Sequence, residues 1–294
     1  MEHHSGTRRS SPRSGKIHRS EPQCAPCSMT PLDPATLLEL ATSIAAEAAA
    51  LIVEGLSRAR TTVDTKTTGT DMVTEMDRAS EALILGLLTK ARPDDAILGE
   101  EGTDRPGSTG VRWIVDPIDG TTNYLYGHAG FAVSIAAEID GAVAAGVVHD
   151  PLHRDVFTAV RGGGSFRNGQ PIQASGETEL SRALIATGFS YEPDRRRRQA
   201  AVLGRLIANV RDIRRMGAAS VDLCSVACGR VDAYYERGLQ PWDHAAGALI
   251  ATEAGAIVGN LSGGAPEFDF CLAAPPALFD GLRTLLIDAD AANA

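Results

Sequence analysis

The sequence has few cysteines and no long apolar run, and these absences exclude several classes of protein. Its five cysteines are an odd number, so they give no disulfide framework. Cys24 and Cys27 have zinc-knuckle spacing but no second ligand pair nearby, and Cys224 and Cys228 fit buried thiols on a helix. No apolar run approaches the roughly 20 residues that cross a bilayer. The N-terminus also lacks the apolar segment of a secretory signal, so we expect a cytoplasmic protein without a membrane anchor.

Positive charge is scarce outside the N-terminus. The 294-residue chain has a net charge of −9, but residues 1–28 alone carry +3, so the remainder holds −12. Such an acidic body argues against nonspecific nucleic-acid binding and suits a protein that gathers cations. Residues 1–29 are polar and rich in Ser, Arg and Pro, which predicts a disordered basic tail. Only this tail is expected to touch RNA or acidic partners, and whether Met1 or Met29 starts the protein stays open.

Residues 30–175 are predicted to contain two helices and many strands. Asp33 and Pro34 supply an N-cap and a first-turn proline for a helix whose apolar residues run to Gly55. A Thr-rich stretch at 61–71 predicts a strand and hairpin, and a capping-box pattern at 74–77 opens the second helix. Further strands are predicted at 96–101, from 113 onward, and at 131–139, 142–149, 156–160 and 165–166. Asp140-Gly141 should close a hairpin.

Strands and helices alternate in residues 176–294. Strands are predicted at 184–189, 231–236, 256–258 and 271–274, and helices at 199–210, 220–228 and 242–253, with one more helix at the end. The order of predicted elements changes near residues 172–180. This change divides the chain into an α+β half with a mostly antiparallel sheet and an α/β half. We therefore expect an α/β protein whose second half completes the site begun in the first.

Acidic residues occur where predicted strands end and where one predicted helix begins: Glu100-Glu101, Asp116 with Asp119, and Asp243. Mg²⁺ takes oxygen ligands and is usually held by a few carboxylates together with a substrate phosphate. The proline at 117 forces a bend, so that Asp116 and Asp119 can face one point. Taken singly, each of these acids also fits a turn, a solvated loop or a helix cap. Taken together they predict a metal site.

A phosphate receptor is predicted beside this metal site. Gly120, Thr121 and Thr122 follow Asp119 at the expected N-terminus of a helix, where backbone N–H groups and hydroxyls are available. A metal next to a phosphate receptor indicates phosphoryl chemistry. A glycosidase with paired carboxylates is disfavoured, because the D-P-x-D-G-T segment clusters the acids too tightly for two separated acid and base groups.

These motifs together resemble the inositol monophosphatase family, most closely its bacterial SuhB-like branch. The matching segments are Gly99-Glu100-Glu101, W-I-V-D-P-I-D-G-T-T-N at 113–123, W-D-H-A-A-G at 242–247, and an earlier motif from Lys66 to Asp77. The likeness runs from about Leu37 to the C-terminus. It implies a layered αβαβα sandwich, usually a homodimer, that uses two to three Mg²⁺ ions and is inhibited by Li⁺.

The resemblance also implies a role for each matching residue. The first metal would be held by Glu101, Asp116 and the carbonyl of Ile118, the second by Asp116, Asp119 and Asp243, and a weaker third by Glu101 and water. Glu101 and Thr121, the latter backed by Asp77, would orient and activate the attacking water. Phosphate would contact Gly120, Thr121 and Thr122, with Lys66 nearby. The remainder of the substrate would contact Gly217, Ala218, Ala219, Glu236 and Asp243.

The resemblance favours Mg²⁺-dependent hydrolysis of myo-inositol 1-phosphate, and Glu236 after two tyrosines supports this choice. Histidinol phosphate, fructose 1,6-bisphosphate and 3′-phosphonucleotides stay open as substrates, since the superfamily reuses the same metal frame. A function of another class also stays open: the resemblance to the SuhB-like branch suggests a noncatalytic protein that binds the transcription and ribosome-assembly machinery. The run from Arg195 to Arg198 fits a solvated helix start better than a phosphate-steering patch.

Overall fold

The computed structural model describes residues 1–4, 6–7, 33–58, 63–65 and 72–294. Contacts within the chain divide it into Met1–Leu32 and Asp33–Ala294. Lys66, the Cys24 and Cys27 pair, and nearly all of the predicted tail lie outside the described residues. The architecture below concerns Asp33–Ala294.

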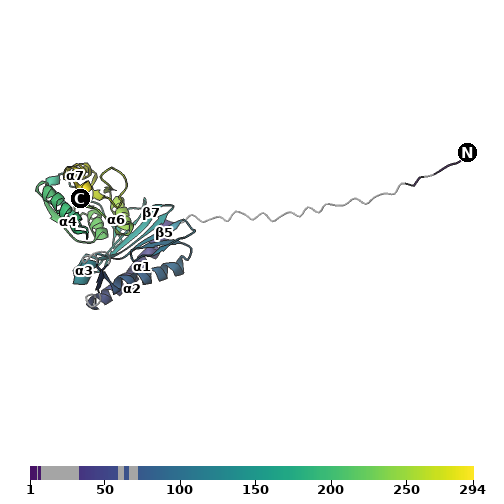
Figure 1. Ribbon diagram of the computed structural model, residues 1–294, viewed down its shortest axis with the longest axis horizontal. Helices are drawn as coiled ribbons and strands as arrows, with labels where there is room; N and C mark the ends of the chain where they lie inside the picture. Colours follow the sequence, from purple (N-terminus) through teal and green to yellow (C-terminus); the bar gives the residue numbers. More distant parts are fainter. Residues whose placement is uncertain (5, 8–32, 59–62, 66–71) are drawn as a thin grey trace. The chain divides into compact units, whose positions relative to one another are not determined.

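Asp33–Ala294 is built of five alternating layers of helices and sheets (Figure 1). The three helical layers are, in order, α1 (Pro34–Gly55) with α2 (Glu75–Ala91), α5 (Ala219–Ala227) with α6 (Pro241–Glu253), and α4 (Pro193–Leu206) with α7 (Pro276–Asp288). An eight-stranded sheet separates the first two layers, and a five-stranded sheet separates the last two. This arrangement confirms the predicted αβαβα sandwich.

The eight-stranded sheet has the order β10-β9-β8-β7-β6-β5-β3-β4 and is antiparallel except where β3 pairs with β5. Its strands are β3 (Ala96–Gly99), β4 (Asp104–Arg105), β5 (Val111–Asp119), β6 (Ala132–Ile139), β7 (Ala142–Asp150), β8 (Asp155–Val160), β9 (Ser165–Arg167) and β10 (Gln170–Pro171). Asp140 and Gly141 turn between β6 and β7 with φ of 51° and 81°, which confirms the predicted hairpin. A separate two-stranded sheet pairs β1 (Val63–Thr65) with β2 (Met72–Thr74).

The five-stranded sheet has the order β12-β11-β13-β15-β14, with β11 parallel to both of its neighbours. Its strands are β11 (Leu184–Thr187), β12 (Asp212–Arg214), β13 (Ala233–Glu236), β14 (Ile257–Gly259) and β15 (Cys271–Ala274). β12 was not predicted, because its three residues lack an apolar alternation. The short helices are α3 (Thr121–Tyr126), η1 (Leu56–Arg58), η2 (Leu180–Arg182), η3 (Ile207–Asn209) and η4 (Ala291–Asn293).

Two predictions about helices are corrected by the structure. α4 begins at Pro193 and not at Gln199, because a proline in the first turn starts the helix and the arginine run continues it. α1 is long and apolar enough to cross a membrane by length and composition, with a mean hydropathy of 1.7, although no such segment was expected. Its apolar face, however, including Ile44 and Ile52, is buried against β6 and β7. Core packing therefore accounts for its composition.

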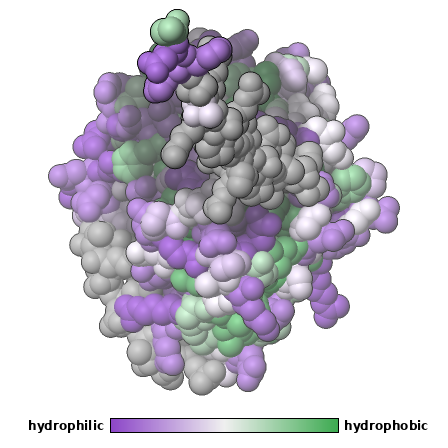
Figure 2. All heavy atoms as spheres, turned by 90° about the vertical axis from the view of Figure 1, so that its right-hand side faces the viewer, coloured by the Kyte–Doolittle hydropathy of each residue, from purple (hydrophilic) through white to green (hydrophobic). Residues whose placement is uncertain are grey.

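Close packing fixes α6 between the two sheets. A Cβ added to Gly146 on β7 would lie 3.0 Å from the Cα of Ala246, and one added to Gly247 would lie 2.9 Å from the Cβ of Leu223 on α5. The small residues of the A-A-G segment therefore let α6 approach both β7 and α5. The large apolar side chains that stay exposed are scattered, and the face in Figure 2 shows green residues among many purple ones. The close contacts at Ala246 and Leu223 hold α6 in place, with its N-terminus near the end of β5.

Candidate active site

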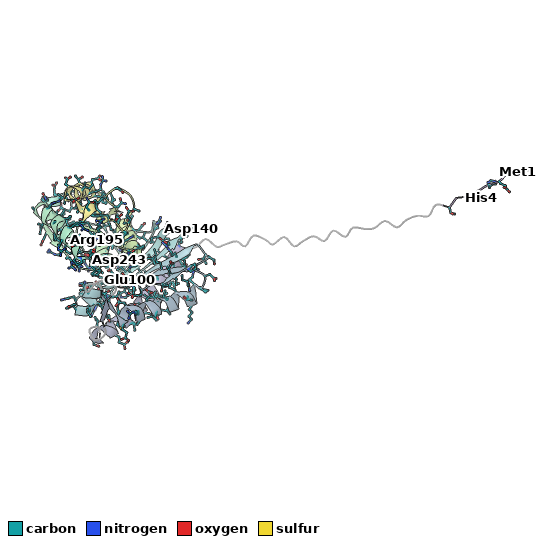
Figure 3. The ribbon with its side chains drawn as sticks, in the orientation of Figure 1. Met1, His4, Glu100, Asp140, Arg195 and Asp243 are labelled. Atoms are coloured by element: carbon teal, nitrogen blue, oxygen red, sulfur yellow. The ribbon has the colours of Figure 1, made fainter. Side chains whose placement is uncertain are left out.

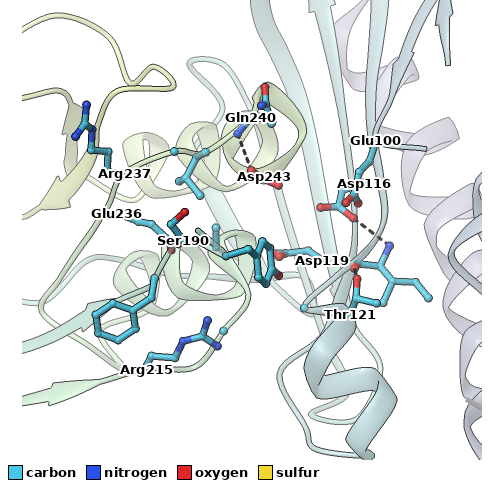
Figure 4. A pocket seen from close by; sticks show the side chains of 18 residues that line it. Glu100, Asp116, Asp119, Thr121, Ser190, Arg215, Glu236, Arg237, Gln240 and Asp243 are labelled. Atoms are coloured by element: carbon cyan, nitrogen blue, oxygen red, sulfur yellow. Dashed lines mark hydrogen bonds between the residues drawn. The ribbon is translucent and has the colours of Figure 1, made fainter. Parts of the chain in front are cut away.

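An acidic pocket of about 320 Å³ lies where β3 and β5 end and α6 begins (Figure 4). Five carboxylates from both halves of the chain line it: Glu100, Asp116, Asp119, Glu236 and Asp243. Figure 3 shows Glu100 and Asp243 at the same place in the fold, although they are far apart in the sequence. The predicted residues Ile118, Gly120, Thr121, Gly217 and Ala219 also line the pocket. Its volume suits a small metabolite.

A β-bulge brings Asp116 and Asp119 to one side of β5. In a regular strand, residues three apart point to opposite faces of the sheet. Here Asp116 pairs with Ser134 and Asp119 pairs with Ala132, so β5 has one residue more than β6 between these pairs. The extra residue restores a common orientation, and both carboxylates reach the pocket. The proline predicted to bend the chain lies inside this bulge.

The structure brings Glu100 into the pocket and not Glu101, which corrects the sequence prediction. Glu100 lines the cavity, whereas Glu101 is not among the residues of its wall. The buried carboxylate of Glu81 on α2 accepts hydrogen bonds from the Glu101 backbone N–H and the Thr103 hydroxyl, both at 2.8 Å. These bonds fix the turn after β3 so that Glu100 faces the other acids. Glu100 therefore occupies the position in the pocket that was predicted for Glu101.

Three other predicted residues lie outside the pocket wall. Asp77 is fully buried behind it and accepts a hydrogen bond from the Thr121 hydroxyl at 3.1 Å, an arrangement that suits a supporting role. Thr122 lies in the first turn of α3, and Ala218 is the N-cap residue of α5. Both flank the pocket without lining it.

Hydrogen bonds from the backbone hold the remaining acids in place. One oxygen of Asp119 accepts from the N–H and the hydroxyl of Ser220 at 2.7 and 2.5 Å. Asp116 accepts from the N–H of Ile118 at 3.0 Å, and Asp243 accepts from the N–H of Gln240 at 2.6 Å in a capping box. Asp116 and Asp243 are thus oriented by residues close to them in the sequence, and Asp119 by the start of α5, 101 residues away.

Burial and mutual repulsion make these carboxylates hard to ionise together. Burial raises the pKa of Asp116 well above its usual range, and the charges of Glu100, Asp119 and Asp243 raise it further. The pKa of Asp243 is likewise raised well above its usual range, first by burial and then by Glu100 and Asp119. Burial raises the pKa of Asp119 despite the opposing hydrogen bonds of Ser220. A bound cation would reverse this penalty.

The donor set fits a hard divalent cation. The acids offer carboxylate oxygens, which Mg²⁺ and similar ions favour, and the electrostatic strain among them calls for positive charge. Within the described ranges, no three His, Cys, Asp or Glu side chains are grouped as a ready-made metal site.

Glu236 forms the opposite wall of the pocket from Glu100. Its carboxylate accepts a hydrogen bond from the Tyr234 hydroxyl at 2.7 Å, and burial raises its pKa to about 7. A Cβ added to Gly188 would lie 1.9 Å from one oxygen of this carboxylate. Glu236 therefore occupies the space that any side chain at position 188 would need. Sequence reasoning named Glu236 but missed Gly188, because the contact joins β11 to β13.

Comparisons with known proteins agree with this geometry. The model of the inositol monophosphatase family matches residues 33–285. The chain is 46% identical over 245 residues to a protein of Mycobacterium bovis named inositol-1-monophosphatase, covering 77% of this chain and 84% of that one. It is 40% identical over 230 residues to a protein of Pasteurella multocida named Nus factor SuhB, covering 78% of this chain and 86% of that one.

Solved structures give the same likeness. The SuhB protein of Bartonella henselae superposes with a TM-score of 0.82 and 36% identity, covering 85% of this chain and 98% of that chain. The SuhB structure of Mycobacterium tuberculosis superposes with a TM-score of 0.75 and 40% identity, covering 89% and 99%. The resemblance inferred from the motifs therefore extends to the whole of the layered fold.

Proposed function

This chain belongs to the inositol monophosphatase family, and we propose that it hydrolyses myo-inositol 1-phosphate with Mg²⁺ as its cofactor. The family supports a metal-dependent phosphatase. One observation carries the proposal: Glu100, Asp116, Asp119 and Asp243 line one pocket, where burial and the like charges of neighbouring acids raise the pKa of Asp116 and Asp243 well above the usual range. We further propose a homodimer that works in the cytoplasm.

The chain's own residues bind and orient the substrate in this proposal. Mg²⁺ held by Glu100, Asp116, Asp119, Asp243 and the carbonyl of Ile118 would supply a Lewis acid for the phosphoryl oxygens and the attacking water. The Thr121 hydroxyl, fixed by Asp77, would position that water. Gly120 and Thr121 would hold the phosphate. Glu236 would accept hydrogen bonds from hydroxyls of the leaving polyol, because it lines the pocket on the side opposite Glu100 and Asp116.

Phosphate release from a panel of esters tests the proposal. Myo-inositol 1-phosphate, histidinol phosphate, fructose 1,6-bisphosphate and 3′-phosphoadenosine 5′-phosphate would each be supplied with Mg²⁺, with EDTA, and with Mg²⁺ plus Li⁺. We expect turnover only with Mg²⁺, inhibition by Li⁺, and the highest kcat/KM for the inositol ester. A higher value for another ester would reassign the substrate, and turnover that persists in EDTA would contradict the metal site.

Gly188→Ala is expected to weaken recognition of polyol esters through Glu236. The added methyl group would displace the Glu236 carboxylate, since the two would otherwise be 1.9 Å apart. We expect kcat/KM for myo-inositol 1-phosphate to fall about 10-fold, the loss of roughly one hydrogen bond to a charged group. The turnover of p-nitrophenyl phosphate, which offers no hydroxyls, should fall much less.

Glu236→Gln is the matched variant for that measurement. It keeps the size of the side chain but removes the charge that accepts the hydroxyl hydrogen bonds. The two variants should show the same shift in preference between the two esters. An equal loss on both esters in either variant would contradict the role of Glu236 in binding the polyol.

A noncatalytic role is the second candidate, favoured by one finding. A relative 40% identical to this chain is named a Nus factor. We propose that any such role would be additional to catalysis, because Glu100, Asp116, Asp119 and Asp243 all line one pocket. Absence of turnover across the whole panel would bring the noncatalytic role to the front.

A further inference from the structure

Arg215 is one of the two arginines that line the pocket in the part of the chain that the structure describes. It makes no hydrogen bond and no ion pair there. The other arginine of the pocket, Arg237, donates to the carbonyl oxygen of Ala294 at 2.5 Å and lies 3.6 Å from the carboxylate of Asp269. In Figure 4 the guanidinium of Arg215 points toward the centre of the pocket, whereas that of Arg237 points away.

The backbone next to Arg215 is held in place, and the Arg215 side chain lies against it. Asn123 on α3 donates to the carbonyl oxygen of Met216 at 2.7 Å and so ties this loop to the phosphate end of the pocket. Gly217 has a φ of +93°, and a Cβ there would lie 2.2 Å from Nη1 of Arg215. The guanidinium therefore lies directly against Gly217, which no other residue could replace without moving it.

Arg215 has two different surroundings. Toward the interior lie three carboxyls, those of Asp119, Asp222 and Glu236. Desolvation is the largest influence on the pKa of each and raises it, whereas the charge of Arg215 lowers it. Toward the outside the side chain is exposed. A guanidinium has five N–H donors in a planar fork, so its outer edge is free to bind a ligand.

We propose that Arg215 gives the pocket a subsite for a second anionic group, a carboxylate or a phosphate at the end of an ester remote from the bond that is cleaved, so that the pocket accepts doubly anionic esters besides myo-inositol 1-phosphate. Glu100 and Asp116 lie on the opposite side of the pocket in Figure 4, so an ester bound there extends toward Arg215. Guanidinium pairs with carboxylate or phosphate through two parallel hydrogen bonds, which a hydroxyl cannot reproduce. This inference rests on the proposed phosphatase function.

Matched sugar esters test the proposal. At C6, glucose 1-phosphate has a hydroxymethyl group and glucuronic acid 1-phosphate has a carboxylate, and the two esters are otherwise the same. Glucose 1,6-bisphosphate carries a phosphate on the C6 oxygen. Competition against the turnover of p-nitrophenyl phosphate gives a Ki for each, whether or not it is hydrolysed. We expect at least one of the two anionic esters to bind about 10- to 100-fold more tightly than glucose 1-phosphate, as for a hydrogen bond to a charged group.

Arg215→Gln should reduce that ratio to about one, because the amide lacks the charge and the fork. Arg214→Gln is the matched control: this neighbouring arginine pairs with Asp212 at 2.7 Å and does not line the pocket, so the ratio should persist. A ratio near one in the wild type, a ratio that survives in Arg215→Gln, or an equal loss in Arg214→Gln would overturn the proposal.

Failure of the proposed function would give a different result. If p-nitrophenyl phosphate were not turned over with Mg²⁺, the phosphatase proposal would fail while the role of Arg215 could still be measured. Titration calorimetry of the same three esters, with Mg²⁺ present, would then supply dissociation constants. The same ratio and its loss in Arg215→Gln would support the anion subsite without catalysis, and equal constants would overturn it.

Discussion

Asp116→Asn is expected to lower kcat/KM for a phosphate ester about 1000-fold or more, the size of effect seen when a main electrostatic stabiliser of a transition state is lost. Asp116 is 1% exposed and lies among three other carboxylates. In the proposed site it would contact both metal ions, so the neutral amide would weaken the whole metal centre. Phosphate release with Mg²⁺ measures the loss.

The same substitution should raise stability when no metal is available. Folding raises the pKa of Asp116, so the folded protein binds a proton more tightly than the unfolded chain does. This group therefore contributes stability below the ordinary carboxyl pKa of 3.8 and loses it as the pH rises through the folded value. At neutral pH in EDTA, Asp116→Asn should have the higher Tm.

Mg²⁺ should reverse this order, since an ion that binds only the folded wild type stabilises it by mass action. Thermal unfolding of both proteins in EDTA and in Mg²⁺ checks both parts. A variant that is inactive but also less stable than the wild type in EDTA would indicate a structural role for Asp116. A variant that keeps wild-type turnover would contradict the metal assignment.

Local signals in the sequence were sufficient for most of the fold. The cap of α1 depends on Asp33, whose carboxylate accepts from the Ala35 N–H at 3.1 Å, and the turn at Asp140 and Gly141 needs the positive φ that these residues tolerate. Such features need no knowledge of distant residues. The start of α4 was misplaced because charged residues gave no apolar periodicity there, although Pro193 marks its first turn.

The site depends on contacts that a sequence does not display. Motif order indicated Asp116, Asp119 and Asp243, but the bulge that aligns the first two is visible only from their pairing with β6. Arg215 was missed because the loop that holds it is tied to Asn123, 93 residues away from Met216. The adjacent acids Glu100 and Glu101 cannot be told apart from the sequence either, because the motif that contains both does not show which side chain lines the pocket.

Glu100→Gln and Glu101→Gln should therefore differ sharply, although they are neighbours with the same chemistry. Glu100 lines the pocket and raises the pKa of both Asp116 and Asp243, so its carboxylate lies close to both. We expect Glu100→Gln to lower kcat/KM about 100- to 1000-fold with Mg²⁺. Raising the Mg²⁺ concentration should restore part of the activity, because the loss lies in metal binding.

Glu101→Gln serves as the matched control. The bond from position 101 to Glu81 comes from the backbone N–H, which the substitution keeps, so the turn after β3 should persist. We expect its kcat/KM to stay within about threefold of the wild type, a change of less than roughly 1 kcal/mol in transition-state binding. Isothermal titration with Mg²⁺ supplies a second readout, since weakened binding should appear only in Glu100→Gln. If Glu101→Gln were the inactive variant, Glu101 would be the metal ligand and the turn after β3 would have to rotate when the ion binds.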